Sequence, residues 1–137
     1  MRVTQKPLLS RPEQQLYGRL VRAFPGYVVF TQIALSQILV VDRGEVPGGS
    51  PSIANRQLVA EFVLCTPDFL VAAVIELDDR SQRREPRRAR DQRKYQLLAD
   101  AGIKVVRVPV DDIPNETALK ALAAVGPAPS SPMRRTG

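Results

Sequence analysis

The sequence predicts a single α/β domain in which helices cover a mixed central sheet, and three observations lead to this fold class. Apolar residues near the N-terminus recur at three- and four-residue spacing, as in an amphipathic helix. Two nearly unbroken apolar runs, 58–65 and 69–77, are typical of strands that are covered on both faces. A length of 137 residues suits one core and is too short for two. The expected order of elements is α-β-β-β-α-β-α.

The first helix is predicted at residues 10–24. Ser10 and Glu13 have the spacing of a capping box, apolar residues follow at helical spacing, and Pro25-Gly26 ends the helix. A strand is expected from Tyr27 to Phe30, with an irregular continuation from Leu35 to Val41. Residues 42–52 are rich in glycine and proline and are expected to form a long loop.

The remaining elements follow from apolar runs and turn residues. Thr66-Pro67-Asp68 separates the two apolar strands, and a helix is expected at about 86–100, ending at Ala101-Gly102. A strand at 103–108 precedes a short C-terminal helix that Asn115 caps and that reaches about residue 125. The domain is therefore expected at 5–125, followed by a disordered tail at 126–137. Tyr17 and Tyr95 are expected to pack in the core.

The composition excludes several kinds of site. The chain contains no histidine and only one cysteine, Cys65, which rules out Ser-His-Asp and Cys-His catalysis and the usual zinc sites. A bound metal would have to be a hard ion held by carboxylates, such as Mg²⁺ or Mn²⁺. No apolar run approaches the roughly 18 residues of a membrane span, and residues 1–15 lack the apolar core of a signal peptide. A cytoplasmic location without membrane contact is therefore expected.

The positive charge is concentrated in one segment. Between Arg80 and Lys94 there are eight basic and two acidic residues, which equals the net charge of +6 of the whole chain. Arginine suits bidentate contacts to phosphate, so the segment indicates nucleic acid as the partner, and DNA is the preferred candidate. The candidate contacts are Arg80, Arg83, Arg84, Arg87, Arg88, Arg90 and Arg93. The alternative is a solvated or disordered run of charges that binds nothing.

Carboxylates mark a candidate site. Glu61 interrupts an apolar strand, where an unpaired buried carboxylate would cost several kcal/mol. Glu76 and Asp78 are two residues apart on a strand and therefore point to the same face. If the two strands pair, the three carboxylates converge, and a divalent cation would neutralise them. Alternatively, Glu61 lies on an edge strand and reaches solvent, and 76–79 is only the polar end of a strand.

The ordered set of motifs resembles the PD-(D/E)xK, or restriction-endonuclease-like, superfamily. Glu76-Leu77-Asp78 with Gln82, then Asp91 and Leu98, then Gly102 with Arg107, is similar to an E-x-D-x-x-x-H, D-x-x-R/K, L and G-x-x-x-x-R pattern. That pattern occurs in a bacterial branch related to the very-short-patch repair endonucleases. The resemblance covers about residues 5–113, and it implies a restriction-endonuclease-like αβββαβ core with a mixed central sheet.

The resemblance also implies site residues. Glu13, Glu61 and Glu76 would hold Mg²⁺ or Mn²⁺, although Glu13 also has the capping role. The catalytic candidates are Glu61, Glu76, Asp78, Gln82 and Lys94.

Three features depart from the family pattern. Glu61 stands where aspartate is usual, Asp78 replaces the superfamily lysine, and Gln82 replaces a histidine and cannot exchange a proton. Lys94 would supply the positive charge that the superfamily lysine normally provides. Equally, Lys94 is a solvated helix residue.

Three interpretations follow. The leading one is a metal-dependent, endonuclease-like protein that acts on DNA phosphodiesters, with impaired activity. The alternative is a catalytically inactive protein that binds nucleic acid through Arg80–Lys94. The third is a module whose arginines meet an acidic protein partner and whose carboxylates only form salt bridges.

Overall fold

The computed structural model describes residues 1–41, 58–79 and 85–126. This part of the chain has the predicted mixed α/β class, with a four-stranded mixed sheet between helices. Its elements are α1 (Arg11–Ala23), β1 (Val28–Ala34), η1 (Leu35–Gln37), β2 (Val59–Cys65), β3 (Val71–Asp78), α3 (Glu85–Asp100), β4 (Lys104–Pro109) and α4 (Glu116–Ala123).

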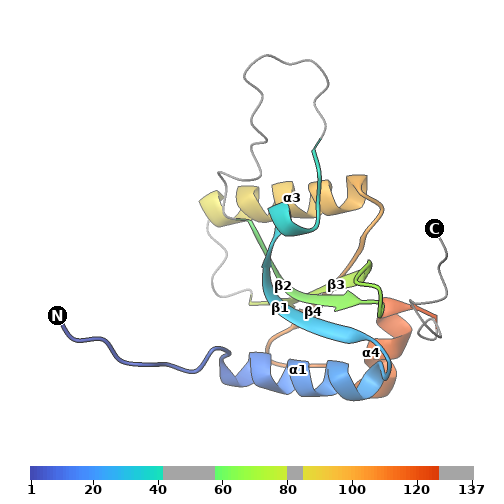
Figure 1. Ribbon diagram of the computed structural model, residues 1–137, viewed down its shortest axis with the longest axis horizontal. Helices are drawn as coiled ribbons and strands as arrows, with labels where there is room; N and C mark the ends of the chain where they lie inside the picture. The colour runs from blue at the N-terminus through green and yellow to red at the C-terminus, as the bar shows by residue number, and fades with distance from the viewer. Residues whose placement is uncertain (42–57, 80–84, 127–137) are drawn as a thin grey trace, which may run out of the picture.

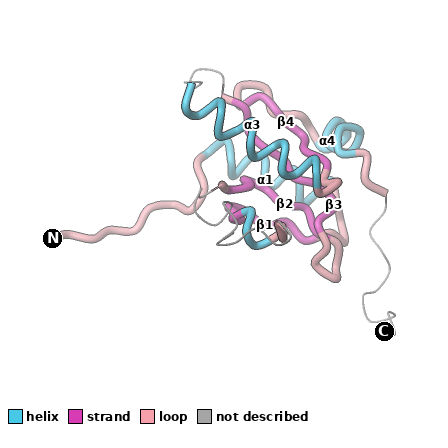
Figure 2. The backbone as a smooth tube through the Cα atoms, turned by 90° about the horizontal axis from the view of Figure 1, so that it is seen from above, coloured by secondary structure: helices cyan, strands magenta, loops and turns pink. Residues whose placement is uncertain are grey.

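The sheet has the strand order β1-β2-β3-β4, in which β1, β2 and β3 are antiparallel neighbours and β4 runs parallel to β3. Helices α1 and α4 cover one face and α3 covers the other, so the domain has three layers (Figure 1). Figure 2 shows α3 lying over the strands on the face away from α1. Since β3 connects to the parallel strand β4 through α3, that helix is the crossover expected between parallel strands.

Both faces of the central strands are buried, as the apolar runs predicted. The core on the α1 side contains Leu16, Leu20, Phe62, Leu64, Ile75, Val108 and Leu119. The core on the α3 side contains Leu35, Leu58, Ala60, Val63, Cys65, Val74 and Leu98. Alternate residues of β3 therefore supply the two cores, as the two-residue periodicity of a strand requires.

The caps explain where the helices begin and end. At α1, the Ser10 hydroxyl accepts from the Glu13 backbone N–H at 3.4 Å and the Glu13 carboxylate accepts from the Ser10 N–H at 2.7 Å, so the capping box is present. Gly26, with φ of 88°, lets the chain turn into β1. At α4, the Asn115 side chain accepts from the Ala118 N–H at 2.9 Å, as predicted.

Several predicted details were wrong. The strand does not continue past Ala34, because the N–H of Leu35 bonds to the Leu58 carbonyl and the chain closes a 3-10 turn there. Strand β3 begins only at Val71, since Phe69 has a left-handed φ of 67°. Tyr17 is 39% exposed, because the neighbouring Leu16 takes the inward position on α1.

The predicted loop at 42–52 and nearly all of the predicted tail, 127–137, lie outside the described residues. No helix in the described ranges combines the length and the apolar character that a membrane span requires.

Candidate functional site

The backbone pairing of the sheet is interrupted at one level, around Glu61. The β1–β2 ladder pairs Thr31 with Phe62 and Ile33 with Ala60, and it skips Gln32 and Glu61 between them. Gln32 has a φ of 57°, a left-handed conformation that costs a non-glycine residue about 1–3 kcal/mol. The face that each strand presents also reverses here: Ala60 packs in the α3-side core and Phe62 in the α1-side core, although they are two residues apart. Such an irregularity redirects side chains at this level.

The β2–β3 ladder ends at the same level, after the pair Phe62–Ile75. Two side chains replace the missing backbone bonds. The Glu76 carboxylate accepts from the Glu61 backbone N–H at 2.7 Å, and the Glu61 carboxylate accepts from the Leu77 backbone N–H at 2.6 Å. Each strand therefore donates to a carboxylate of the other strand, which holds Glu61 and Glu76 side by side.

Lys94, from the third turn of α3, completes this buried group. Its ammonium donates to the second oxygen of the Glu76 carboxylate and to the Val59 carbonyl, the latter at 3.1 Å. Lys94 is 8% exposed and Glu76 3%. Of the two interpretations left open for Lys94, the structure supports the one in which it supplies positive charge to the carboxylates. The alternative of a solvated helix residue is wrong.

One ammonium for two carboxylates leaves an excess of negative charge. Burial, and then repulsion from Glu76, raise the pKa of Glu61 to about 7, although the Leu77 N–H opposes the shift. Burial also raises the pKa of Glu76, against the effect of Lys94. A carboxyl group with a pKa near neutrality can release or accept a proton under ordinary conditions, and this property is common in catalytic acids and bases.

Two further residues lie at the same level, and sequence reasoning gave neither a functional role. Arg107 on β4 is the register partner of Glu76, and its Nη2 donates to Asp78 at 3.3 Å. Its guanidinium also lies over the ring of Tyr95, 4.9 Å from the centroid. Tyr95 is half-buried between Arg107 and Lys94, whose ammonium is 5.4 Å from the ring centroid. The G-x-x-x-x-R spacing contained Arg107 but gave no sign of what it contacts.

The other predicted carboxylates are engaged elsewhere. Asp78 forms the ion pair with Arg107. Glu13 stays in the capping box and accepts from the Gln32 amide at 3.4 Å, although its charge contributes to the raised pKa of Glu61. Among the described residues, no group of three or more acidic, cysteine or histidine side chains could hold a metal ion. The carboxylates that meet directly are Glu61 and Glu76.

The predicted basic contacts are only partly described. Arg80, Gln82, Arg83 and Arg84 lie outside the described residues, as does the side chain of Arg87. The three others, Arg88, Arg90 and Arg93, are exposed on α3. These three arginines belong to the helix that carries Lys94.

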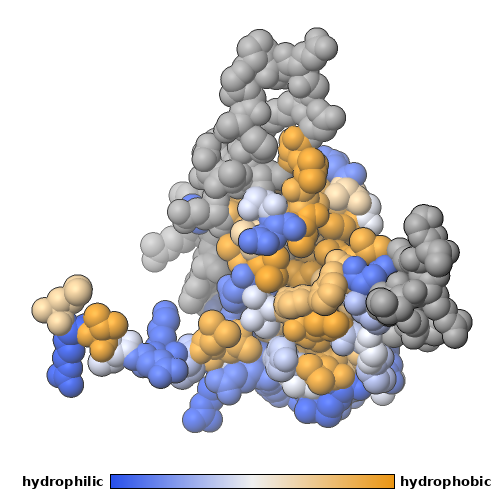
Figure 3. Space-filling view, in the orientation of Figure 1, coloured by the Kyte–Doolittle hydropathy of each residue, from blue (hydrophilic) through white to orange (hydrophobic). Residues whose placement is uncertain are grey.

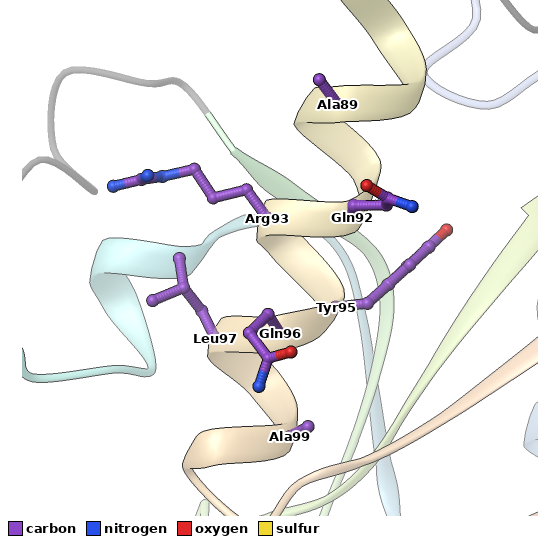
Figure 4. A pocket seen from close by; sticks show the side chains of 7 residues that line it. All are labelled: Ala89, Gln92, Arg93, Tyr95, Gln96, Leu97 and Ala99. Carbon is purple, nitrogen blue, oxygen red and sulfur yellow. The ribbon is translucent and has the colours of Figure 1, made fainter.

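Two other surface features do not contain the paired carboxylates. A hollow of about 910 Å³ is lined by residues of α3 alone, with Tyr95 pointing to one side of the helix and Arg93 and Leu97 to the other (Figure 4). It is therefore the surface around one helix and not a cleft between elements. Apolar side chains also gather over β1 (Figure 3), where the rings of Phe30 and Phe69 are 6.2 Å apart. Neither feature includes Glu61 or Glu76.

The fold and the site define a mixed α/β domain with a buried carboxylate–lysine group at the place where its strands separate. The chain belongs to the family described as "Protein of unknown function (DUF2726)", whose model matches residues 5–123. No curated protein and no solved structure matches the chain.

Proposed function

We propose that this protein is a divalent-metal-dependent nuclease of the PD-(D/E)xK type that acts on DNA phosphodiesters. One observation carries the proposal: Glu61 and Glu76 are held together where two ladders open, with Lys94 buried against them. Such a group is costly to bury and is not needed to close a sheet, so a functional role explains it best. The αβββαβ order, with β4 parallel to β3, agrees with a restriction-endonuclease-like core.

The residues fit Mg²⁺ or Mn²⁺ in type. Magnesium is usually held by one or two carboxylates, together with waters and substrate phosphates, so a third carboxylate is not required. Glu61 and Glu76 would hold the ion, and the second oxygen of Glu61 takes part in no hydrogen bond within the described residues. When bound, the ion supplies polarisation of the phosphodiester and a lowered pKa for the attacking water.

The chain's own groups account for the rest of the reaction. Without an ion, burial and Glu76 raise the pKa of Glu61 to about 7, and a bound cation would favour the ionised form that serves as its ligand. Lys94 uses two of its three donors on Glu76 and Val59, which leaves the third for a phosphate oxygen. The arginines of α3 hold the nucleic acid. The cytoplasm is the compartment that this proposal requires, in agreement with the single Cys65.

Nicking of supercoiled plasmid tests the proposal. Wild-type protein with Mg²⁺ is expected to nick slowly, because Gln82 replaces a proton-transferring histidine and such groups contribute about 10²- to 10⁴-fold to rate. Gln82→His is expected to accelerate nicking, more so together with Glu61→Asp. Glu76→Ala or a chelator should abolish it. Asp111→Ala, which removes an exposed carboxylate beyond β4, serves as the control.

A second candidate is a catalytically inactive protein that binds nucleic acid. It is favoured by the ion pair of Lys94 with Glu76, which already neutralises one carboxylate without a metal. If the Gln82→His, Glu61→Asp double variant binds both DNA and Mn²⁺ but does not nick, this second function replaces the first.

A further inference from the structure

We propose that Arg107 binds the phosphate of the DNA strand that lies over Glu61 and Glu76. The inference rests on the proposed function and adds a substrate-binding residue to it. It follows from the position of Arg107, from the contacts that orient its guanidinium and from the charge of its surroundings.

Arg107 is placed at the level of the carboxylates. It is the register partner of Glu76 across the parallel β3–β4 pair, so the two Cα atoms lie about one strand spacing, ~4.8 Å, apart. Register partners point to the same face of a sheet, and Arg107 reaches Tyr95 of α3 on that face. Glu61, Glu76 and Arg107 thus form one row across β2, β3 and β4. An anion that approaches the carboxylate pair meets the guanidinium.

Two contacts orient the guanidinium and leave most of it available. Nη2 donates to Asp78, and the Tyr95 ring supports one face of the group. Within the described residues, no other hydrogen bond of the Arg107 side chain is present, and the side chain is 42% exposed. A guanidinium has five N–H donors, so several point outward from an already fixed fork. A preorganised arginine loses little conformational entropy when it binds a phosphate.

The charges agree with this role. The row and its close neighbours carry three acidic groups, Glu61, Glu76 and Asp78, and two basic ones, Lys94 and Arg107. Asp91 and Glu13 add further negative charge to the surroundings of Glu76 and Glu61. The carboxylates would therefore repel a phosphodiester unless a positively charged group also contacted that phosphodiester. Arg107 is the basic group on the β4 side of the row, while Lys94 contacts Glu76 from α3. A divalent ion at the carboxylates would offset part of the negative charge.

The test measures duplex binding by fluorescence anisotropy at several NaCl concentrations. Calcium chloride is present in each sample, and a gel shows that the duplex stays intact. Arg107→Ala is expected to lower affinity by about tenfold and to reduce the slope of log K against log salt by about 0.9, the value for one phosphate contact. Arg107→Lys should restore most of the slope, because the charge returns, but only part of the affinity, because the fork is lost. Arg22→Ala, on the opposite face of the sheet, is the matched control and should change affinity less than twofold.

Melting temperatures separate binding from folding. If Arg107→Ala is not folded at the assay temperature, Arg107→Gln, which keeps a donor for Asp78, takes its place. An unchanged affinity and slope in the folded variant, or an equal loss in Arg22→Ala, would overturn the role of Arg107. That result would leave the nuclease proposal standing if Glu76→Ala still abolishes nicking. Absence of any duplex binding by the wild type would overturn both.

Discussion

At the scale of single residues, Glu61 is held by interactions that oppose one another. The Leu77 N–H stabilises its ionised form, while burial and the neighbouring Glu76 favour its protonated form, and the result is a pKa of about 7. The same carboxylate would have to be ionised to serve as a metal ligand. Its protonation therefore links the stability of the fold to the state of the site.

The raised pKa predicts how stability depends on pH. Unfolded, Glu61 has a pKa near 4.5, so between about pH 4.5 and 7 the native protein keeps a proton that the unfolded chain has released. The free energy of unfolding should therefore decrease as the pH rises through this range. Glu61→Gln keeps the acceptor for Leu77 but does not titrate. Urea unfolding of both proteins at pH 5, 6, 7 and 8 should show the wild type losing stability relative to Glu61→Gln. A difference that stays constant with pH would contradict the burial of an ionisable Glu61.

At the scale of elements, α3 carries a buried lysine and exposed arginines. Lys94 and Leu98, four residues apart, share the face that packs on the sheet, since a helix has 3.6 residues per turn. Arg88, Arg90 and Arg93 are exposed. The helix therefore positions Lys94 against Glu76 and leaves its arginines in solvent.

The exposed arginines of α3 should carry part of the affinity for DNA. The triple variant Arg88→Ala, Arg90→Ala, Arg93→Ala is expected to bind all duplex sequences more weakly and with a flatter salt dependence, because each lost phosphate contact lowers the slope by about 0.9. The control replaces Arg11, Arg22 and Lys120, which are exposed on α1 and α4, with alanine. Both variants lose three positive charges. Equal effects in the two variants would assign the binding to net charge and not to α3.

At the scale of the whole molecule, the site lies between the two helical layers. Lys94 reaches it from α3, while Glu13 acts on Glu61 from α1 on the opposite face. A cation bound to Glu61 and Glu76 would therefore cross-link β2 and β3 at the level where their ladder ends. Binding of this kind stabilises the native state alone.

Manganese should accordingly raise the melting temperature. At a concentration of about 100 times Kd, a ligand of the native state adds about 2.7 kcal/mol to the free energy of unfolding, which corresponds to several degrees. The shift should occur in the wild type and in Asp111→Ala and disappear in Glu76→Ala. Differential scanning fluorimetry, with MnCl₂ raised to about 100 times Kd, makes the comparison. An equal shift in Glu76→Ala would place the ion at another site.

The sequence by itself determined the elements and their class, because the signals involved act within a few residues. Ser10 and Glu13 set the start of α1, and the nearly unbroken apolar runs marked the buried strands β2 and β3. The pairing of Glu61 with Glu76 could be anticipated because one short turn joins their strands, which restricts the register.

Only the tertiary structure decided which distant groups complete the site. Lys94 meets Glu76 because α3 crosses the sheet at one particular height, and Arg107 lies beside Tyr95 because β4 pairs with β3 in one register. Gln32 adopts a left-handed conformation although it is not a glycine. Its neighbours in the sheet impose this conformation, and its own propensity does not favour it. Contacts of this kind depend on packing between segments far apart in the chain, and no local pattern of residues encodes them.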